Sequence, residues 1–153
     1  MKKLFITLAV VVFGISLSAQ NTDDYMEVQR GVLKTEKKAV VADAMEFTEE
    51  ESTVFWPLYN EYNDKMYTLN TKVYNLIKDY AKNFENITDE KAVELWNENM
   101  KVKAELAKLE KTYFKKFQKI IPAKKAARYF QLESKIRTLV NAELALEIPL
   151  LEE

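Results

Sequence analysis

Apolar residues recur along this chain at alternating steps of four and three, the spacing of a helix face that packs lengthwise on another helix. The first run is Phe55, Tyr59, Tyr62, Met66, Leu69, Val73, Leu76 and Tyr80. The second run is Leu95, Asn99, Val102, Leu106, Leu109, Tyr113 and then Phe117 or Ile120, with a polar interruption at Asn99. The two runs predict a pair of long antiparallel helices.

Shorter runs of the same kind flank this pair. One follows it with Tyr129, Leu132, Ile136, Leu139 and Leu146, and one precedes it with Val28, Val32, Ala39, Val40 and Ala42. Strand patterns are nearly absent, and residues Ala, Leu, Glu and Lys favour helix. We therefore predict an all-α fold of four helices, at about 26–45, 48–84, 88–119 and 122–147, built on a long bent antiparallel hairpin.

Three of the predicted helices open in a similar way, with an apolar residue, a cap or proline, charged residues and then an aromatic cluster. The openings are Phe47-Thr48, Ile87-Thr88 and Ile121-Pro122. Thr48 is expected to cap its helix, with Glu51 as the reciprocal half of a capping box. Thr88 is expected to cap its helix in the same way, but without the acidic residue that completes a capping box. Pro122 is expected to start its helix as a proline at the first position. The pattern has two interpretations: the openings are three ordinary helix starts, or they are copies of a shared functional unit.

Pro57 lies inside the second predicted helix, nine residues beyond Thr48. A proline there removes one helical hydrogen bond and clashes with the preceding turn. We expect the helix to bend at this point, with Trp56 packed at the elbow. The alternative is a break into two separate helices.

A basic cluster surrounds the last turn between helices. It consists of Lys115, Lys116, Lys119, Lys124, Lys125 and Arg128. Lys124 and Lys125 fall in the first turn of a helix, where the macrodipole favours acidic residues. The cluster is either a solvated face or a contact for an anionic partner or client.

The N-terminus has the form of a secretory signal peptide. Lys2 and Lys3 precede an uncharged apolar run from Leu4 to about Leu17, and small residues follow up to Ala19. The run is shorter than the roughly 20 residues of a spanning helix, so we expect no stable membrane insertion. We predict cleavage near Ala19, export to the periplasm or beyond, and a single helical domain over residues 20–153.

Missing residue types exclude several classes of function. The chain has no histidine and no cysteine, so the usual zinc sites, thiol nucleophiles and Ser-His relays cannot be built. Without Lys2 and Lys3, 21 of the 23 basic residues remain against 24 acidic ones, a balance of about −3 that is not typical of nucleic-acid binding. We predict no enzyme and no cofactor.

The openings "FTEEESTVFWPLYNEY" and "IIPAKKAARYFQLESKIR" resemble those of the Spy/CpxP family of periplasmic stress chaperones, in Bacteroidetes-type versions of its LTXXQ motif. The motif's leucine falls on Phe47, Ile87 and Ile121, and its glutamine on Glu51, Lys91 and Lys125. The resemblance implies an ATP-independent chaperone, a thin curved helical dimer that holds unfolded clients on an apolar and basic concave face. Residues of matching type here are Met66, Tyr67, Tyr74, Met100, Lys115, Lys116, Lys124 and Arg128.

Three functions follow as hypotheses. The first is a holdase for unfolded or partly folded envelope proteins, for which Tyr67 and Tyr74, seven residues apart beside the first seam, would be partly exposed together with Met66. Core packing or a dimer interface explains these three residues more simply. The second is a regulatory protein that docks on a membrane stress sensor. The third is a metal-binding protein that uses carboxylate pairs such as Glu94 and Glu98.

Overall fold

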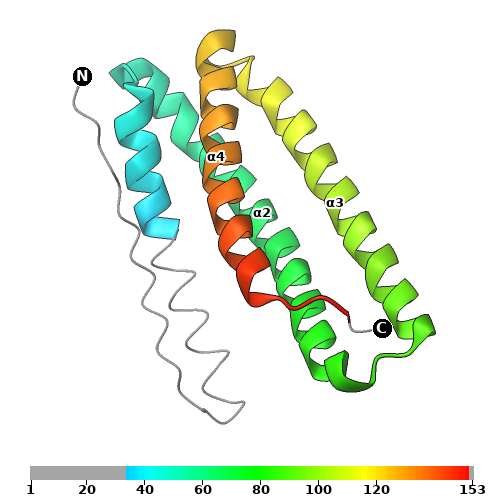
Figure 1. The fold of residues 1–153 in the computed structure, drawn as a ribbon. Coiled ribbons are helices and arrows are strands. Elements are labelled where there is room, and N and C mark those ends of the chain that lie inside the picture. The colour runs from blue at the N-terminus through cyan, green and yellow to red at the C-terminus, as the bar shows by residue number, and fades with distance from the viewer. Residues whose placement is uncertain (1–33, 152–153) are drawn as a thin grey trace. The chain divides into compact units, whose positions relative to one another are not determined.

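The computed structural model describes residues 34–151, and throughout this range the fold is all-α, as predicted (Figure 1). Residues 34–45 form a first helix. They are followed by α2 (Glu49–Asn83), the short 3-10 helix η1 (Phe84–Asn86), α3 (Asp89–Phe117) and α4 (Ala123–Glu147). The predicted signal peptide and residues 26–33 of the predicted first helix lie outside the described residues.

The chain divides into two compact units at Val41. The described part of the first unit, residues 34–40, is helical. The second unit runs from Val41 to Glu153, and it contains the last turn of the first helix together with α2, α3 and α4. The packing and the surfaces described below all belong to this second unit.

Helix α2 continues through Pro57 without interruption, so of the two alternatives the break into separate helices is wrong. The Pro57 side chain is exposed, while its neighbours anchor the helix on the inner side. The Trp56 ring meets Phe55 and Tyr59 edge-on, each at 5.1 Å between ring centroids. Because packing on both sides of the proline holds the turn together, the lost backbone hydrogen bond does not end the helix.

Helices α2 and α3 are antiparallel neighbours joined by η1 (Figure 1). Three ion pairs between them show the direction, because residue numbers rise on α2 as they fall on α3. The pairs are Lys116–Glu61 at 2.9 Å, Lys72–Glu105 at 2.6 Å and Lys91–Asp79 at 2.7 Å. The two long apolar runs therefore face each other as the periodicity predicts.

The core is a cluster of aromatic rings where the first part of α4 meets α2 and the end of α3. Phe117 lies fully buried among Phe55 at 5.1 Å, Tyr129 at 5.0 Å and Phe130 at 5.8 Å. The second apolar run was predicted to end at Phe117 or Ile120. Because Phe117 is buried and Ile120 is partly exposed, Phe117 is the residue that faces the core. The buried members of the cluster are Val41, Met45, Phe55, Tyr59, Tyr62, Met66, Tyr113, Phe117, Ile121, Ala126 and Tyr129.

Two predicted apolar runs differ from the structure. In the first helix, Val41 and Met45 are buried while Ala42 is exposed, so the predicted face is rotated by one position. Alanine fits either side of a helix and therefore marks a face poorly. In α4 the run continues to Leu139 and Leu146, but these side chains are 65% and 87% exposed. The periodicity of α4 thus extends beyond the part that is packed.

Candidate binding surfaces

The predicted caps are present at the helix openings. The Thr48 hydroxyl accepts a hydrogen bond from the Glu51 N–H at 3.2 Å, and the Thr48 N–H donates to the Glu51 carboxylate at 3.0 Å. Thr88 accepts from the Lys91 N–H at 3.2 Å. Pro122 occupies the cap position of α4, and helical residues begin only at Ala123, one residue later than predicted. These contacts stabilise helix ends and account for the motif residues without a ligand.

Lys125 has a structural explanation for its place in the first turn of α4. Its ammonium group forms an ion pair with the Glu51 carboxylate and donates to the Glu46 carbonyl at 3.2 Å. It also lies 5.6 Å from the centroid of the Phe47 ring. The hydrogen bond from Lys125 is the main reason that the pKa of Glu51 falls below its ordinary value, and the Thr48 backbone N–H adds to it. Contacts with α2 thus offset the unfavourable helix dipole.

Two other members of the basic cluster also bind within the chain. The Arg128 Nε donates to the Ala44 carbonyl at 3.0 Å, close to the end of the first helix. Lys116 binds Glu61 and lies 4.4 Å from the centroid of the Tyr113 ring. Lys115, Lys119 and Lys124 remain exposed. The predicted cluster is therefore divided between structural contacts and three solvent-facing cations.

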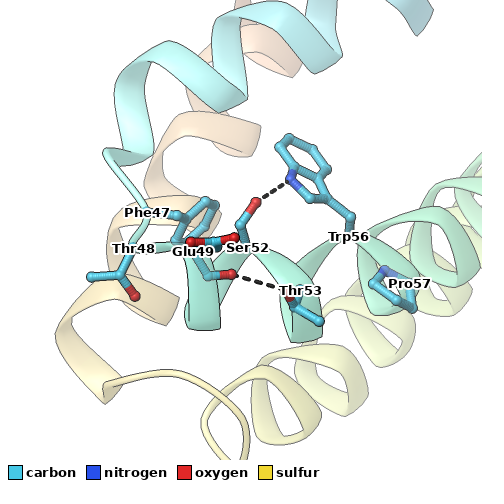
Figure 2. A pocket seen from close by; sticks show the side chains of 7 residues that line it. All are labelled: Phe47, Thr48, Glu49, Ser52, Thr53, Trp56 and Pro57. Carbon is cyan, nitrogen blue, oxygen red and sulfur yellow. Dashed lines mark hydrogen bonds between the residues drawn. The ribbon is translucent and has the colours of Figure 1, made fainter.

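Two open hollows lie near these helix starts. The first, of about 570 Å³, is shown in Figure 2, where the Trp56 indole N–H donates to the Ser52 hydroxyl at 2.9 Å. Its lining is Phe47, Thr48, Glu49, Ser52, Thr53, Trp56 and Pro57. The second, of about 430 Å³, is lined by Ala44, Met45, Glu46, Pro122, Lys124, Lys125 and Arg128. Both are wide and open, which suits a surface contact better than an enclosed small molecule.

The apolar client-binding candidates fall into different environments. Met66 is only 6% exposed and points into the seam between the helices, so its predicted exposure is wrong. Tyr67 and Met100 are 40% and 45% exposed. Tyr74 is half-buried, with the Lys78 ammonium 5.4 Å from its ring centroid. The exposed candidates thus lie on separate helices, Tyr67 on α2 and Met100 on α3, and not in one enclosed site.

Sequence reasoning missed the most exposed aromatic side chain among the described residues. Trp96 on α3 is 63% exposed, and Val93 beside it is 60% exposed. With Met100 they follow steps of three and four along α3 and therefore share one face. The spacing of Val93, Trp96 and Met100 could have identified this face from the sequence. It was missed because the longer apolar run through Leu95 and Val102 lies on the same helix and was taken as the only apolar face.

The described residues hold no group of three or more carboxylate side chains that could bind a metal ion. Glu94 is paired with Lys91 at 3.0 Å, and Glu98 with Lys101 at 3.5 Å, so both carboxylates of the predicted pair already have cationic partners. No helix in residues 34–151 is long and apolar enough to cross a membrane.

A buried carboxylate, Glu133, lies among core tyrosines. Burial, followed by the charge of Glu133, raises the pKa of Tyr59, Tyr62 and Tyr129 well above the ordinary value. These hydroxyls therefore stay protonated at neutral pH. A nucleophile, a base and an orienting group in one accessible place would indicate catalysis. Tyr62 and Tyr129 instead lie fully within the aromatic core, which makes them packing residues.

Comparison with protein-family models, curated proteins and solved structures finds no match to this chain. The resemblance to the Spy/CpxP family thus rests on the helix openings alone.

Proposed function

We propose that this protein is an exported, ATP-independent chaperone that binds unfolded or partly folded polypeptides. One observation carries the proposal: large apolar side chains are exposed on α2, α3 and α4 of a unit that has a well-packed core of its own. They are Val54, Tyr67, Val93, Trp96, Met100, Leu139, Leu144 and Leu146.

The chemistry of these side chains suits an unfolded chain as ligand. Covering apolar surface contributes roughly 25 cal/mol per Å², and an unfolded polypeptide offers apolar segments in many arrangements. Binding groups spread over three helices favour varied partners over one shaped ligand, and methionine and aromatic side chains re-pack readily. Lys115, Lys119 and Lys124 would attract acidic segments of the same clients.

The fold is compatible with the family that the helix openings resemble. It is all-α, it has α2 and α3 as antiparallel neighbours, and it has threonine caps at two of the three openings. A curved dimer, a concave client face and a periplasmic location complete the proposal.

Light scattering of a chemically denatured client, without nucleotide, tests the proposal. We expect the protein to suppress aggregation at ratios near one to one. A triple variant, Val54→Ser, Tyr67→Ser and Leu139→Ser, should lose at least half of this effect, because all three positions are exposed and outside the core. The matched control replaces exposed polar residues on the same helices, Asn60→Ser, Asn70→Ser and Gln131→Ser.

The control should suppress aggregation as the unchanged protein does. Unchanged scattering with each of several clients would refute the proposal. Equal loss in both triple variants would show that the apolar surface is not responsible.

A regulatory protein that docks on a membrane stress sensor is the second candidate. The observation that favours it is the group of three exposed lysines, Lys115, Lys119 and Lys124, around the turn between α3 and α4. Affinity capture from the producing cell distinguishes the two functions. A single stoichiometric partner, lost when the three lysines are changed to glutamate, supports docking, whereas a spread of unrelated proteins supports the chaperone.

A further inference from the structure

The second half of α4, residues 138–147, has an apolar face that the core does not cover. Leu139, Ala142 and Leu146 follow steps of three and four and therefore share one face of the helix. All three are exposed, Leu139 at 65% and Leu146 at 87%. Leu150 and Leu151 extend the apolar surface beyond the helix end, at 89% and 46% exposed. A single exposed leucine is ordinary, but several on one surface indicate a contact site.

Two hydrogen bonds hold the segment that follows this face. The Ile148 N–H donates to the Leu144 carbonyl at 3.1 Å, which closes the last turn of α4. The Tyr80 hydroxyl donates to the Pro149 carbonyl at 2.8 Å, so the segment after α4 lies at the end of α2 (Figure 1). The exposed leucines of this segment are therefore held close to the end of α4.

The charge of α4 changes sign where its packing ends. The first part of the helix has one acidic residue, Glu133, and five basic residues: Lys124, Lys125, Arg128, Lys135 and Arg137. From Thr138 to Glu153 the sequence has no basic residue and four acidic ones: Glu143, Glu147, Glu152 and Glu153. The segment that carries the exposed apolar face therefore has negative charges only.

The end of α4 adds to this negative charge. The C-terminus of a helix carries a partial negative charge, which lysine or arginine in the last turn offsets. Lys82 is in this position in α2, and Lys115 and Lys116 are in α3. The last turn of α4 has no basic residue, and it contains the exposed Glu147. The end of α4 therefore favours a cation that α4 itself does not supply.

We infer that the second half of α4 binds a cationic amphipathic helix of a partner polypeptide. The inference rests on the proposed function, and it names the class of segment that this part of the client surface binds. Apolar side chains of the partner would cover Leu139 and Leu146, while its lysines or arginines would meet Glu147 and the helix end. An amphipathic helix laid against an apolar surface is a common mode of peptide recognition.

The negative charge of this segment argues against other macromolecules as partners. Helices that bind membrane surfaces carry lysine and arginine on their polar face, and anionic lipids repel acidic segments. The phosphates of nucleic acid repel them for the same reason. A basic polypeptide thus matches both the apolar face and the charge.

The contact is short. Residues 138–147 span about 15 Å, since a helix rises 1.5 Å per residue, so a partner helix of about three turns matches this length. Such a contact is smaller than a standard protein interface. We therefore expect a reversible complex with a Kd on the order of ten micromolar.

Titration calorimetry of the full chain with synthetic peptides tests the inference. The probe is a helix-forming peptide of leucine and lysine with all leucines on one face. One control peptide has the same composition with the leucines spread around the helix, and a second has glutamate in place of lysine. Only the probe should bind in the micromolar range, and rising salt should weaken its binding. Equal binding of either control peptide, or no binding of the probe, would overturn the inference.

Variants of α4 test which side chains make the contact. Leu139→Ser with Leu146→Ser should raise the Kd for the probe about tenfold or more, because a few central apolar contacts carry most of the affinity. Ile120→Ser, at an exposed apolar position just before α4, is the matched control and should leave the Kd unchanged. An unchanged Kd in the double variant would overturn the inference.

A second pair of variants tests the charge. Glu147→Gln should raise the Kd about threefold, because one charge next to the partner is removed. Glu50→Gln removes an exposed acid in the first turn of α2 and should have no effect. Equal effects of the two variants would show a response to net charge alone and would contradict binding at the end of α4.

A fluorescent label locates the contact, since the chain has no cysteine. An environment-sensitive label on Ala142→Cys should shift its emission when the probe is added. The same label on Gln131→Cys, which is exposed on the first part of α4, should not respond. A response at Gln131→Cys alone would place the peptide elsewhere and overturn the inference.

Two further outcomes separate this inference from its alternatives. Binding of the chain to phosphatidylcholine and phosphatidylglycerol vesicles, lost in the double leucine variant, would assign the face to a membrane and overturn the inference. Suppression of client aggregation without binding of the probe would also overturn it but leave the chaperone proposal standing. Binding of the probe without suppression of aggregation would refute the chaperone proposal alone.

Discussion

Two halves of the α2–α3 pair follow the same apolar repeat yet are packed to different depths. In the half near the start of α2, Phe55, Tyr62 and Phe117 are fully buried under α4. In the half near η1, Leu69, Val73 and Leu76 are only half-buried. Ion pairs such as Lys72–Glu105 and Lys91–Asp79 flank this second half. The repeat therefore tells which way a side chain faces, and a third helix determines how deeply it is buried.

The largest expected effect concerns truncation in the two halves. Phe117→Ala should lower the free energy of unfolding by about 3–5 kcal/mol, because it opens a cavity among four rings. Leu76→Ala should cost about 1–2 kcal/mol, since part of that side chain is already in water. Urea unfolding measures both. Ile120→Ala, at the exposed neighbour of Phe117, should change stability by less than about 1 kcal/mol.

Equal losses for Phe117→Ala and Leu76→Ala would mean that the two halves are equally packed in solution, and the comparison would fail.

A smaller effect is expected at the helix caps, one in each half. Thr48→Ala should cost about 1 kcal/mol, because it removes the hydroxyl that accepts from the Glu51 N–H and leaves the bond from the Thr48 backbone N–H to the Glu51 carboxylate without its reciprocal half. Thr88→Ala should cost about half as much, since only one hydrogen bond is lost. Thermal unfolding of the two variants, with the exposed Thr53→Ser as a conservative control, gives the order. A larger loss at Thr88 would reverse the expected ranking of the two ends.

The smallest effect is a dependence on pH. The Tyr113 hydroxyl and then Lys116 lower the pKa of Glu61, and Lys72 lowers the pKa of Glu105. A carboxylate with a lowered folded pKa contributes stability above its ordinary pKa of 4.5 and loses it as the pH falls through the lower value. The melting temperature should therefore fall on acidification from about pH 5 downward.

Glutamine variants locate the source of that decline. Glu61→Gln should flatten the pH profile more than Glu105→Gln, because Glu61 accepts from two donors and one of them, Tyr113, is buried. If Glu105→Gln instead reduced the pH dependence of the melting temperature more than Glu61→Gln does, the acid sensitivity would come from the half near η1.

Much of the architecture was predictable from local chemistry. The caps at Thr48 and Thr88, the helix bounds within a few residues, and the seam from Phe55 to Tyr80 depend on residues close in sequence, whose spacing carries the information. For Pro57 the sequence favoured one helix over a break but left both alternatives open, because the outcome depends on the rings of Phe55 and Tyr59, which the core holds in place.

The candidate sites were less predictable for a related reason. Lys125 and Arg128 read as a basic surface in the sequence, yet their partners, Glu51 and the Ala44 carbonyl, lie more than 70 positions away. Met66 was predicted to be partly exposed but is buried in the apolar seam of α2. Trp96 was not among the predicted binding residues but is exposed. Periodicity and capping, acting over one or two turns, determined the helices of this protein. Only the packing of α2, α3 and α4 on one another decided which charges are paired and which apolar side chains remain open to a partner.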